Sequence, residues 1–183
     1  MQEESNPVKD YLFEYISKSE EKLQKLIVDK KFSEIIDDVI KNCYDNIITI
    51  GEKGESIGVL ATGLLHFLLT SALLTSQRKI VYHEIDIDIV IPDLKTLEKD
   101  PKKTLIIYII KTANKNLIKQ KLNKLEKIQP EKQNIWLVSS QSLDFKNKSY
   151  IIDKENNTFS KIIFDIAQFV NVQGQDKFKI LRV

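Results

Sequence analysis

The chain has 183 residues, of which 42% are hydrophobic and 30% are charged, and its formal net charge is +2. These values suit one folded domain with a sizeable core, and they exclude a disordered chain. With two histidines and a single cysteine, Cys43, the sequence offers neither a disulfide framework nor a thiolate zinc site. The segment MQEESNPVKD at the N-terminus contains no apolar signal region, so we expect a cytoplasmic protein.

Residues 1–50 predict a helical extension that precedes an α/β domain over residues 51–183. Apolar side chains recur at intervals of three and four over residues 8–28 and again over residues 32–47, which is typical of amphipathic helices. We expect this helical pair to pack on the following domain or on a second subunit. The segment GEKGES then carries two glycines, which favour a turn.

Residues 57–74 carry no charged side chain and reach the lower length limit of a membrane span. The same run contains the polar residues Thr62, His66 and Thr70, and no second run of this kind occurs in the sequence. A helix that is apolar on all sides is also what the centre of a globular domain requires. We therefore expect a buried core helix over residues 55–76 rather than a membrane anchor.

From residue 81 the apolar period changes from that of a helix to that of a strand. Isoleucines alternate with three acidic residues and then with Val90 until Pro92, which cannot donate to a ladder, so we expect one strand over residues 81–91. Residues 105–110 are continuously apolar, as in a strand buried on both faces. The remaining expectations are a polar connection over 93–103, helices over 114–128 and 159–170, short strands over 134–140 and 149–153, and a strand or tail over 177–183. A strand, a helix and a strand in succession imply a parallel crossover, and hence an α/β fold with a sheet flanked by helices.

Positive charge gathers in residues 101–133, which hold nine lysines and two glutamates. A local excess of this kind is typical of a surface that faces phosphate groups. The candidate nucleic-acid contacts are Lys102, Lys103, Lys115 and Lys119. The other interpretation is a solvated, lysine-rich helix face that has no partner.

Two segments resemble a known family. The run HEIDIDIVIPD is an acidic strand, and the later run TLIIYIIKT is an apolar strand that ends in a lysine. Over about residues 54–140 this arrangement resembles the PD-(D/E)xK superfamily of restriction-endonuclease-like nucleases, which includes archaeal Holliday-junction resolvases. The resemblance implies a mixed sheet flanked by helices. It also implies that Asp88 is a metal-binding aspartate, Lys111 the catalytic lysine and Glu55 the acid of the preceding helix.

The chemistry that this resemblance implies is metal-dependent cleavage of a phosphodiester. Asp88 and Asp86 would hold Mg²⁺ or Mn²⁺, which activates a water and neutralises charge on the phosphate, while Lys111 stabilises the transition state. The pattern departs from the family at Ile109, which stands two residues before the lysine, where the family carries an acid. Asp86 or Glu84 could supply a displaced carboxylate, because strand alternation puts both on the face of Asp88.

The sequence therefore predicts a DNA-binding protein of nuclease-like fold with a degenerate site, which binds DNA, branched DNA included, as a homodimer. The alternative is a catalytically inactive subunit that binds another protein in a larger complex. A purely structural interpretation also stands. In that case the acids form the solvent-exposed face of a strand, where their charge prevents edge-to-edge pairing with another molecule. Lys111 is then the polar end of a buried strand.

Overall fold

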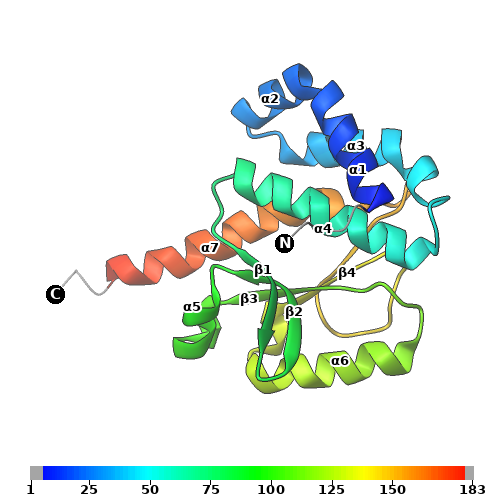
Figure 1. Ribbon diagram of the computed structural model, residues 1–183. Helices are drawn as coiled ribbons and strands as arrows, with labels where there is room; N and C mark the ends of the chain where they lie inside the picture. The colour runs from blue at the N-terminus through cyan, green and yellow to red at the C-terminus, as the bar shows by residue number, and fades with distance from the viewer. Residues whose placement is uncertain (1–5, 180–183) are drawn as a thin grey trace.

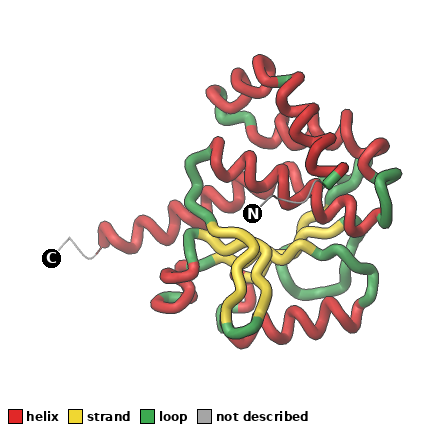
Figure 2. Tube along the Cα trace, viewed as in Figure 1, coloured by secondary structure: helices red, strands yellow, loops and turns green. Residues whose placement is uncertain are grey.

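The computed structural model describes residues 6–179, with side chains through residue 173, and shows a five-stranded sheet between two layers of helices (Figures 1 and 2). The helices are α1 (Pro7–Lys18), α2 (Glu20–Val28), α3 (Phe32–Ile47), α4 (Lys53–Ser71), α5 (Leu94–Lys99), α6 (Lys115–Ile128) and α7 (Ile162–Lys179). The strands are β1 (Gln77–Tyr82), β2 (Ile85–Ile91), β3 (Leu105–Ile109), β4 (Ile135–Ser139) and β5 (Ser149–Ile151). Short 3-10 helices are η1 (Pro101–Lys103), η2 (Lys132–Asn134) and η3 (Thr158–Lys161).

The order of the strands across the sheet follows their order in the chain. β1, β2 and β3 form an antiparallel meander, whereas β4 runs parallel to β3 and β5 runs parallel to β4. The pairing changes from antiparallel to parallel between β3 and β4. A parallel pair needs a long crossover, and α6 provides it. The structure confirms the expected α/β class with a sheet flanked by helices.

Two hydrophobic clusters hold the layers together. The α4-side cluster joins buried residues of α1–α4 and α7 to one face of the sheet, with Leu12, Ile40, Leu64 and Ile107 among its members. The α6-side cluster joins α5 and α6 to the opposite face. α1 approaches α4 closely, since a Cβ at Gly63 would lie 2.9 Å from Leu12 Cδ2. The N-terminal helices therefore pack on α4 of the same chain, which is the first of the two expected arrangements.

α4 is the central helix of the α4-side layer, above the sheet in Figure 1. Its apolar side chains are buried on most sides, which explains why residues 57–71 lack charge, whereas Leu73 lies beyond the helix and is exposed. The side chain of Glu52 begins the helix by accepting a hydrogen bond of 3.0 Å from the Glu55 N–H. The expected core helix is present, but it ends at Ser71 and not at residue 76. None of the helices within residues 6–179 has the length and apolarity that a bilayer crossing needs.

Several expected boundaries are wrong. Residues 8–28 form two helices, because Ser19 has a non-helical backbone (φ −103°, ψ 10°) that ends α1 and precedes α2. Part of the expected polar connection is helical, as α5 and η1. Residues 177–179 belong to α7 rather than to a strand, and residues 180–183 of that expected segment lie outside the described residues.

The expected strand over residues 81–91 is a hairpin. A turn at His83 and Glu84 joins β1 to β2, and β1 begins at Gln77, before the expected strand. Both turn residues have positive φ, 48° and 60°, as a tight turn between twisted antiparallel strands requires. Asparagine and glycine usually adopt this conformation. Because histidine and glutamate stand here instead, the sequence pattern did not indicate a turn.

β2 changes its relation to the sheet at Asp88. Ile87 belongs to the α6-side cluster and Ile89 to the α4-side cluster, so the pleat does not alternate regularly through Asp88. β2 pairs with β3 only from Ile89 to Ile91. Across the hairpin, Lys79 has a φ of 51°, and its pairing with Asp88 is missing from the β1–β2 ladder. The tip of the hairpin therefore extends past the region in which β2 pairs with β3.

The turn conformation predicts a stabilising substitution. Glu84→Gly should raise the free energy of unfolding by about 1 kcal/mol, because glycine adopts positive φ without the Cβ penalty of other residues. Thermal melting should register this as an increase of about 2–4 °C. Glu84→Ala is the matched control, since it removes the same carboxylate but keeps the Cβ. An equal gain for both variants would show that the carboxylate, and not the backbone, is responsible.

Candidate functional site

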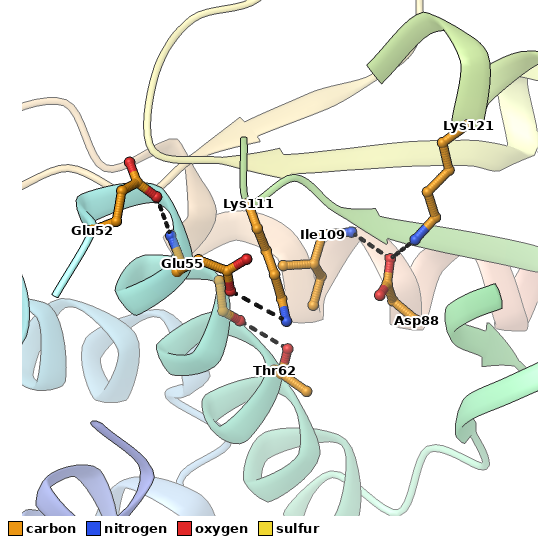
Figure 3. A network of polar contacts seen from close by, with 8 residues as sticks. Glu52, Glu55, Thr62, Asp88, Ile109, Lys111 and Lys121 are labelled. Atoms are coloured by element: carbon orange, nitrogen blue, oxygen red, sulfur yellow. Dashed lines mark hydrogen bonds and ion pairs between the residues drawn. The ribbon is translucent and has the colours of Figure 1, made fainter. Parts of the chain in front are cut away.

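Lys111 lies just beyond the end of β3, against the first turns of α4 (Figure 3). Its Nζ is 3.8 Å from Glu55 Oε2, and the two side chains are 40% and 61% exposed. An ion pair this exposed contributes little to stability, because water screens both charges. The contact brings together two of the three residues to which the resemblance assigns catalytic roles.

Two glycines of α4 let Lys111 lie close to the helix. A Cβ at Gly54 would be 2.5 Å from the Lys111 backbone oxygen, and a Cβ at Gly58 would be 2.5 Å from Lys111 Cγ. Residues four apart share one helix face, so the two glycines form a shallow channel along α4. The stem of Lys111 occupies this channel, and its ammonium emerges near Glu55.

Asp88 has its contacts at β3 and α6. Its Oδ2 accepts hydrogen bonds from the Ile109 N–H and from Lys121 Nζ, each at 3.1 Å (Figure 3). The next backbone N–H along β3, that of Ile110, bonds to Val138 of β4, so the Ile109 N–H faces the side of β2. Because β2 no longer pairs with β3 here, the Asp88 carboxylate replaces the missing strand acceptor.

Lys121 reaches Asp88 from α6. Its Nζ also lies 4.5 Å from the centre of the Tyr108 ring, at a distance that permits cation–π attraction. Burial raises the pKa of Tyr108 to about 12, and the negative charge of Asp88 adds to this effect. The Lys121 and Asp88 side chains are 28% and 24% exposed, so the pair is better shielded from water than the Lys111–Glu55 pair.

Sequence reasoning did not select Lys121. The signal was present, because Lys121 comes three residues after Ile118 and four before Leu125, both of which α6 buries. A lysine on the core-facing side of an amphipathic helix requires a buried stem and a polar partner. The identity of that partner depends on the tertiary fold.

The remaining candidate ligands lie on the outer part of the hairpin. Asp86 is exposed opposite Val81, and Glu84 is exposed in the turn. The expectation that these acids share one strand face with Asp88 is wrong, because the turn removes Glu84 from the strand and the pleat is irregular at Asp88. Within residues 6–173, no group of three or more histidine, cysteine, aspartate or glutamate side chains is arranged to hold a metal ion.

The four candidate DNA-binding lysines lie in two groups. Lys115 and Lys119 occupy the first turns of α6, whereas Lys102 and Lys103 belong to η1. The Gln129 side chain at the end of α6 bonds to two carbonyl oxygens beside η1, which ties η1 to the far end of the helix. The helix rise places the two groups about 20 Å apart. They therefore mark the two ends of α6 rather than a single patch at Lys111.

A small pocket of about 100 Å³ opens at the carboxyl ends of β3 and β4. Lys53 and Gly54 of α4 line one side, and Lys111, Ser139 and Ser140 line the other. A volume of this size holds a few water molecules and not a nucleotide. The pocket can hydrate the Lys111 region without enclosing a substrate there.

Because Gly58 contacts Lys111, we expect Gly58→Ala to change the free energy of unfolding in opposite directions in the wild-type chain and in a Lys111→Ala background. Gly58→Ala should lower the free energy of unfolding in the wild-type chain, because the new methyl group displaces the Lys111 stem. In a Lys111→Ala background it should raise that energy by about 1 kcal/mol, since alanine favours a helix over glycine. Denaturant unfolding of the four proteins of this cycle measures both values.

Gly54→Ala is the control for this cycle. Its Cβ would meet the Lys111 backbone oxygen, which remains in the Lys111→Ala background, so this variant should destabilise both proteins. Equal effects of Gly58→Ala in the two backgrounds would contradict the proposed contact.

Comparison of the chain with protein-family models, with curated proteins and with solved structures gives no match. The chemical interpretation of this site therefore depends on the contacts among its own residues. Two features define it: the Lys111–Glu55 pair on the α4 side, and the Asp88–Lys121 pair between β2, β3 and α6.

Proposed function

We propose that this chain is a DNA-binding protein of restriction-endonuclease-like fold in which an internal ion pair has replaced the catalytic metal. The observation that carries the proposal is the Asp88 carboxylate. The oxygen that would bind a cation already accepts bonds from Lys121 Nζ and from the Ile109 N–H. The carboxylate thus has a positive partner and a hydrogen-bond donor without any ion.

The order of the elements supports this proposal. α4, β2, β3, the α6 crossover and β4 follow one another in the order that the resemblance implies, and β1 is an additional strand. Lys111 meets Glu55, and Asp88 lies beside the strand that carries Lys111. The three residues to which the resemblance gives catalytic roles thus occupy neighbouring positions around the end of β3.

The same site argues against cleavage. Ile109 is 2% exposed within the α4-side cluster, and its side chain offers no oxygen to a metal. A Mg²⁺ or Mn²⁺ ion at Asp88 would have to displace Lys121 from contact with the carboxylate. In the chemistry that the resemblance implies, the metal activates the attacking water, and Lys111 alone cannot replace it. We infer that Mg²⁺ or Mn²⁺ binds only in a variant in which Ile109 is replaced by an acid and Lys121 by a residue without charge.

DNA binding is favoured by the charge of the α6 region. Lys102, Lys115 and Lys119 are exposed, whereas Lys103 has an ion pair with Asp100 at 2.7 Å. Because the whole chain is nearly neutral, this local excess is the feature that would attract a polyanion. A surface of about 20 Å along α6 also suits contacts to successive phosphates of a duplex or a branched DNA.

A salt titration tests the DNA-binding proposal. Labelled duplex and four-way-junction DNA should bind at low salt, with an affinity that falls steeply as salt rises. Removing two phosphate contacts with Lys115→Gln and Lys119→Gln should reduce the slope of log affinity against log salt by about 2. Lys41→Gln, an exposed position on α3 across the sheet, is the control and should leave the slope unchanged. Absence of binding to both DNAs at low salt would contradict the proposal.

Calorimetry with Mn²⁺ tests the proposal that Lys121 takes the place of a metal ion at Asp88. We expect no calorimetric signal for Mn²⁺ with the wild type, Ile109→Glu or Lys121→Ala. The double variant Ile109→Glu/Lys121→Ala should bind Mn²⁺, because it has two carboxylates on adjacent strands and no competing ammonium. Binding by the wild type that is lost in Asp88→Asn, together with cleavage of junction DNA, would show that the site is intact.

The alternative function, a subunit that binds another protein, is favoured by α7. Figure 1 shows the C-terminal half of this helix extending away from the body. Phe164 and Val172 are 62% and 59% exposed, and their spacing of eight residues places them on one side of the helix. Gln168 and Asn171 are exposed between them, so the two apolar side chains form no continuous patch, but a protein partner or the homodimer that the sequence predicts would cover them. A failure to bind DNA at low salt would favour this alternative.

A further inference from the structure

A groove of about 350 Å³ runs between α6 and the loop that joins β4 to β5. Lys119, Lys132 and Lys146 line it with positive charge, and Leu122 and Phe145 supply apolar surface. A pocket of this volume is large enough for a ligand of small-molecule size. It lies on the α6 side of the sheet, away from the contact between Lys111 and α4.

The charge in the groove is unbalanced. Its acidic residue, Glu126, pairs with Lys132 at 2.6 Å. Neither Lys119 nor Lys146 forms an ion pair with another residue in the described part of the chain, and both are exposed. Two ammonium groups therefore stand on opposite walls without a carboxylate, and they favour an anionic occupant.

The loop that carries Phe145 is held in place. The Asn147 side chain donates to the backbone oxygens of Lys132 and Ile135, at 3.3 and 3.1 Å. Phe145 packs against the edge of the α6-side cluster and is only partly buried, so part of its ring faces the groove. The aromatic surface is therefore in place before any ligand arrives.

We propose that this groove binds an unpaired nucleotide of single-stranded DNA, with the base against Phe145 and the flanking phosphates at Lys119 and Lys146. Stacking on an aromatic ring beside a row of cations is how proteins hold single strands without reading their sequence. A base within a duplex is covered by its neighbours and cannot reach the ring. An acidic peptide would satisfy the lysines and leave the ring unused. The proposal rests on the DNA binding proposed above and adds a preference for unpaired strands.

Lys115 extends the same row of cations by one helical turn toward the end of β3. A strand that leaves the groove along α6 would therefore reach the region beside Lys111. This continuity suits a DNA that contains both a duplex and an unpaired segment, such as a junction or a flap.

Fluorescence anisotropy with a labelled oligothymidylate of about twelve nucleotides, within the usual site size, tests the proposal. Phe145→Leu keeps the apolar packing and removes the aromatic face, and it should weaken single-strand binding on the order of tenfold. Lys146→Glu should weaken it further, because it reverses a charge beside a phosphate. Phe145→Leu should leave the affinity for a blunt duplex of the same length unchanged.

Two controls are matched to these variants. Leu143→Met changes a partly buried residue of the same loop that does not line the groove, and Lys41→Glu reverses a charge on the opposite side of the sheet. Both should bind single strands as the wild type does, and thermal melting should show that all variants are folded. If Phe145→Leu melts at the same temperature as the wild type, its weaker binding is caused by the loss of the aromatic ring and not by unfolding.

The outcomes separate this proposal from the function on which it rests. If Phe145→Leu and Lys146→Glu bind the single strand with wild-type affinity, the proposal that the groove holds an unpaired nucleotide is wrong. Duplex binding by the wild type would in that case still support the proposed function. A wild type that binds neither probe would overturn both. Binding of a polyglutamate peptide, undiminished in Phe145→Leu and stronger than that of the oligonucleotide, would assign the groove to an acidic protein segment instead.

Discussion

The carboxylate of Asp88 joins three elements at the point where the sheet loses a strand pairing. β2 pairs with β3 only from Ile89 onward, so the Ile109 N–H, which lies beyond this pairing, needs another acceptor, because a buried backbone donor without one costs about 1–3 kcal/mol. Asp88 supplies that acceptor, and Lys121 balances its charge from α6. The tip of the hairpin, the central strand and the crossover helix are thus tied together by one side chain. A metal ion would have to break this arrangement before it could bind there.

On the other side of β3, close packing sets the geometry. Gly54 and Gly58 remove the side chains that would otherwise hold α4 away from Lys111. The lysine can then bury its stem while its ammonium meets Glu55. The two faces of one strand end therefore differ in kind. The α4 face keeps an exposed cation and acid, and the side of β2 and α6 holds a satisfied and shielded ion pair. This difference is the basis of our proposal that an internal ion pair takes the place of a metal at Asp88.

Local periodicity was sufficient for the elements whose apolar faces are regular. β3, α6 and β4 lie close to their predicted positions, because each buries a continuous run or a clean stripe. The hairpin was missed because His83 and Glu84 adopt a conformation that their residue types rarely signal. Within the site, Lys111 and Glu55, which the sequence analysis had both selected, lie in contact. The partnership of Asp88 with Lys121 could not be predicted, because the two are 33 residues apart and meet only once α6 crosses the sheet.

We propose that Lys121 occupies the place of a metal ion at Asp88. The most direct measurement is anomalous diffraction from crystals of the wild-type chain soaked in Mn²⁺. We expect no manganese peak at Asp88, with Lys121 Nζ still in contact with its Oδ2. A manganese ion bound to the Asp88 carboxylate, with Lys121 turned away from it, would show that the lysine does not take the place of a metal.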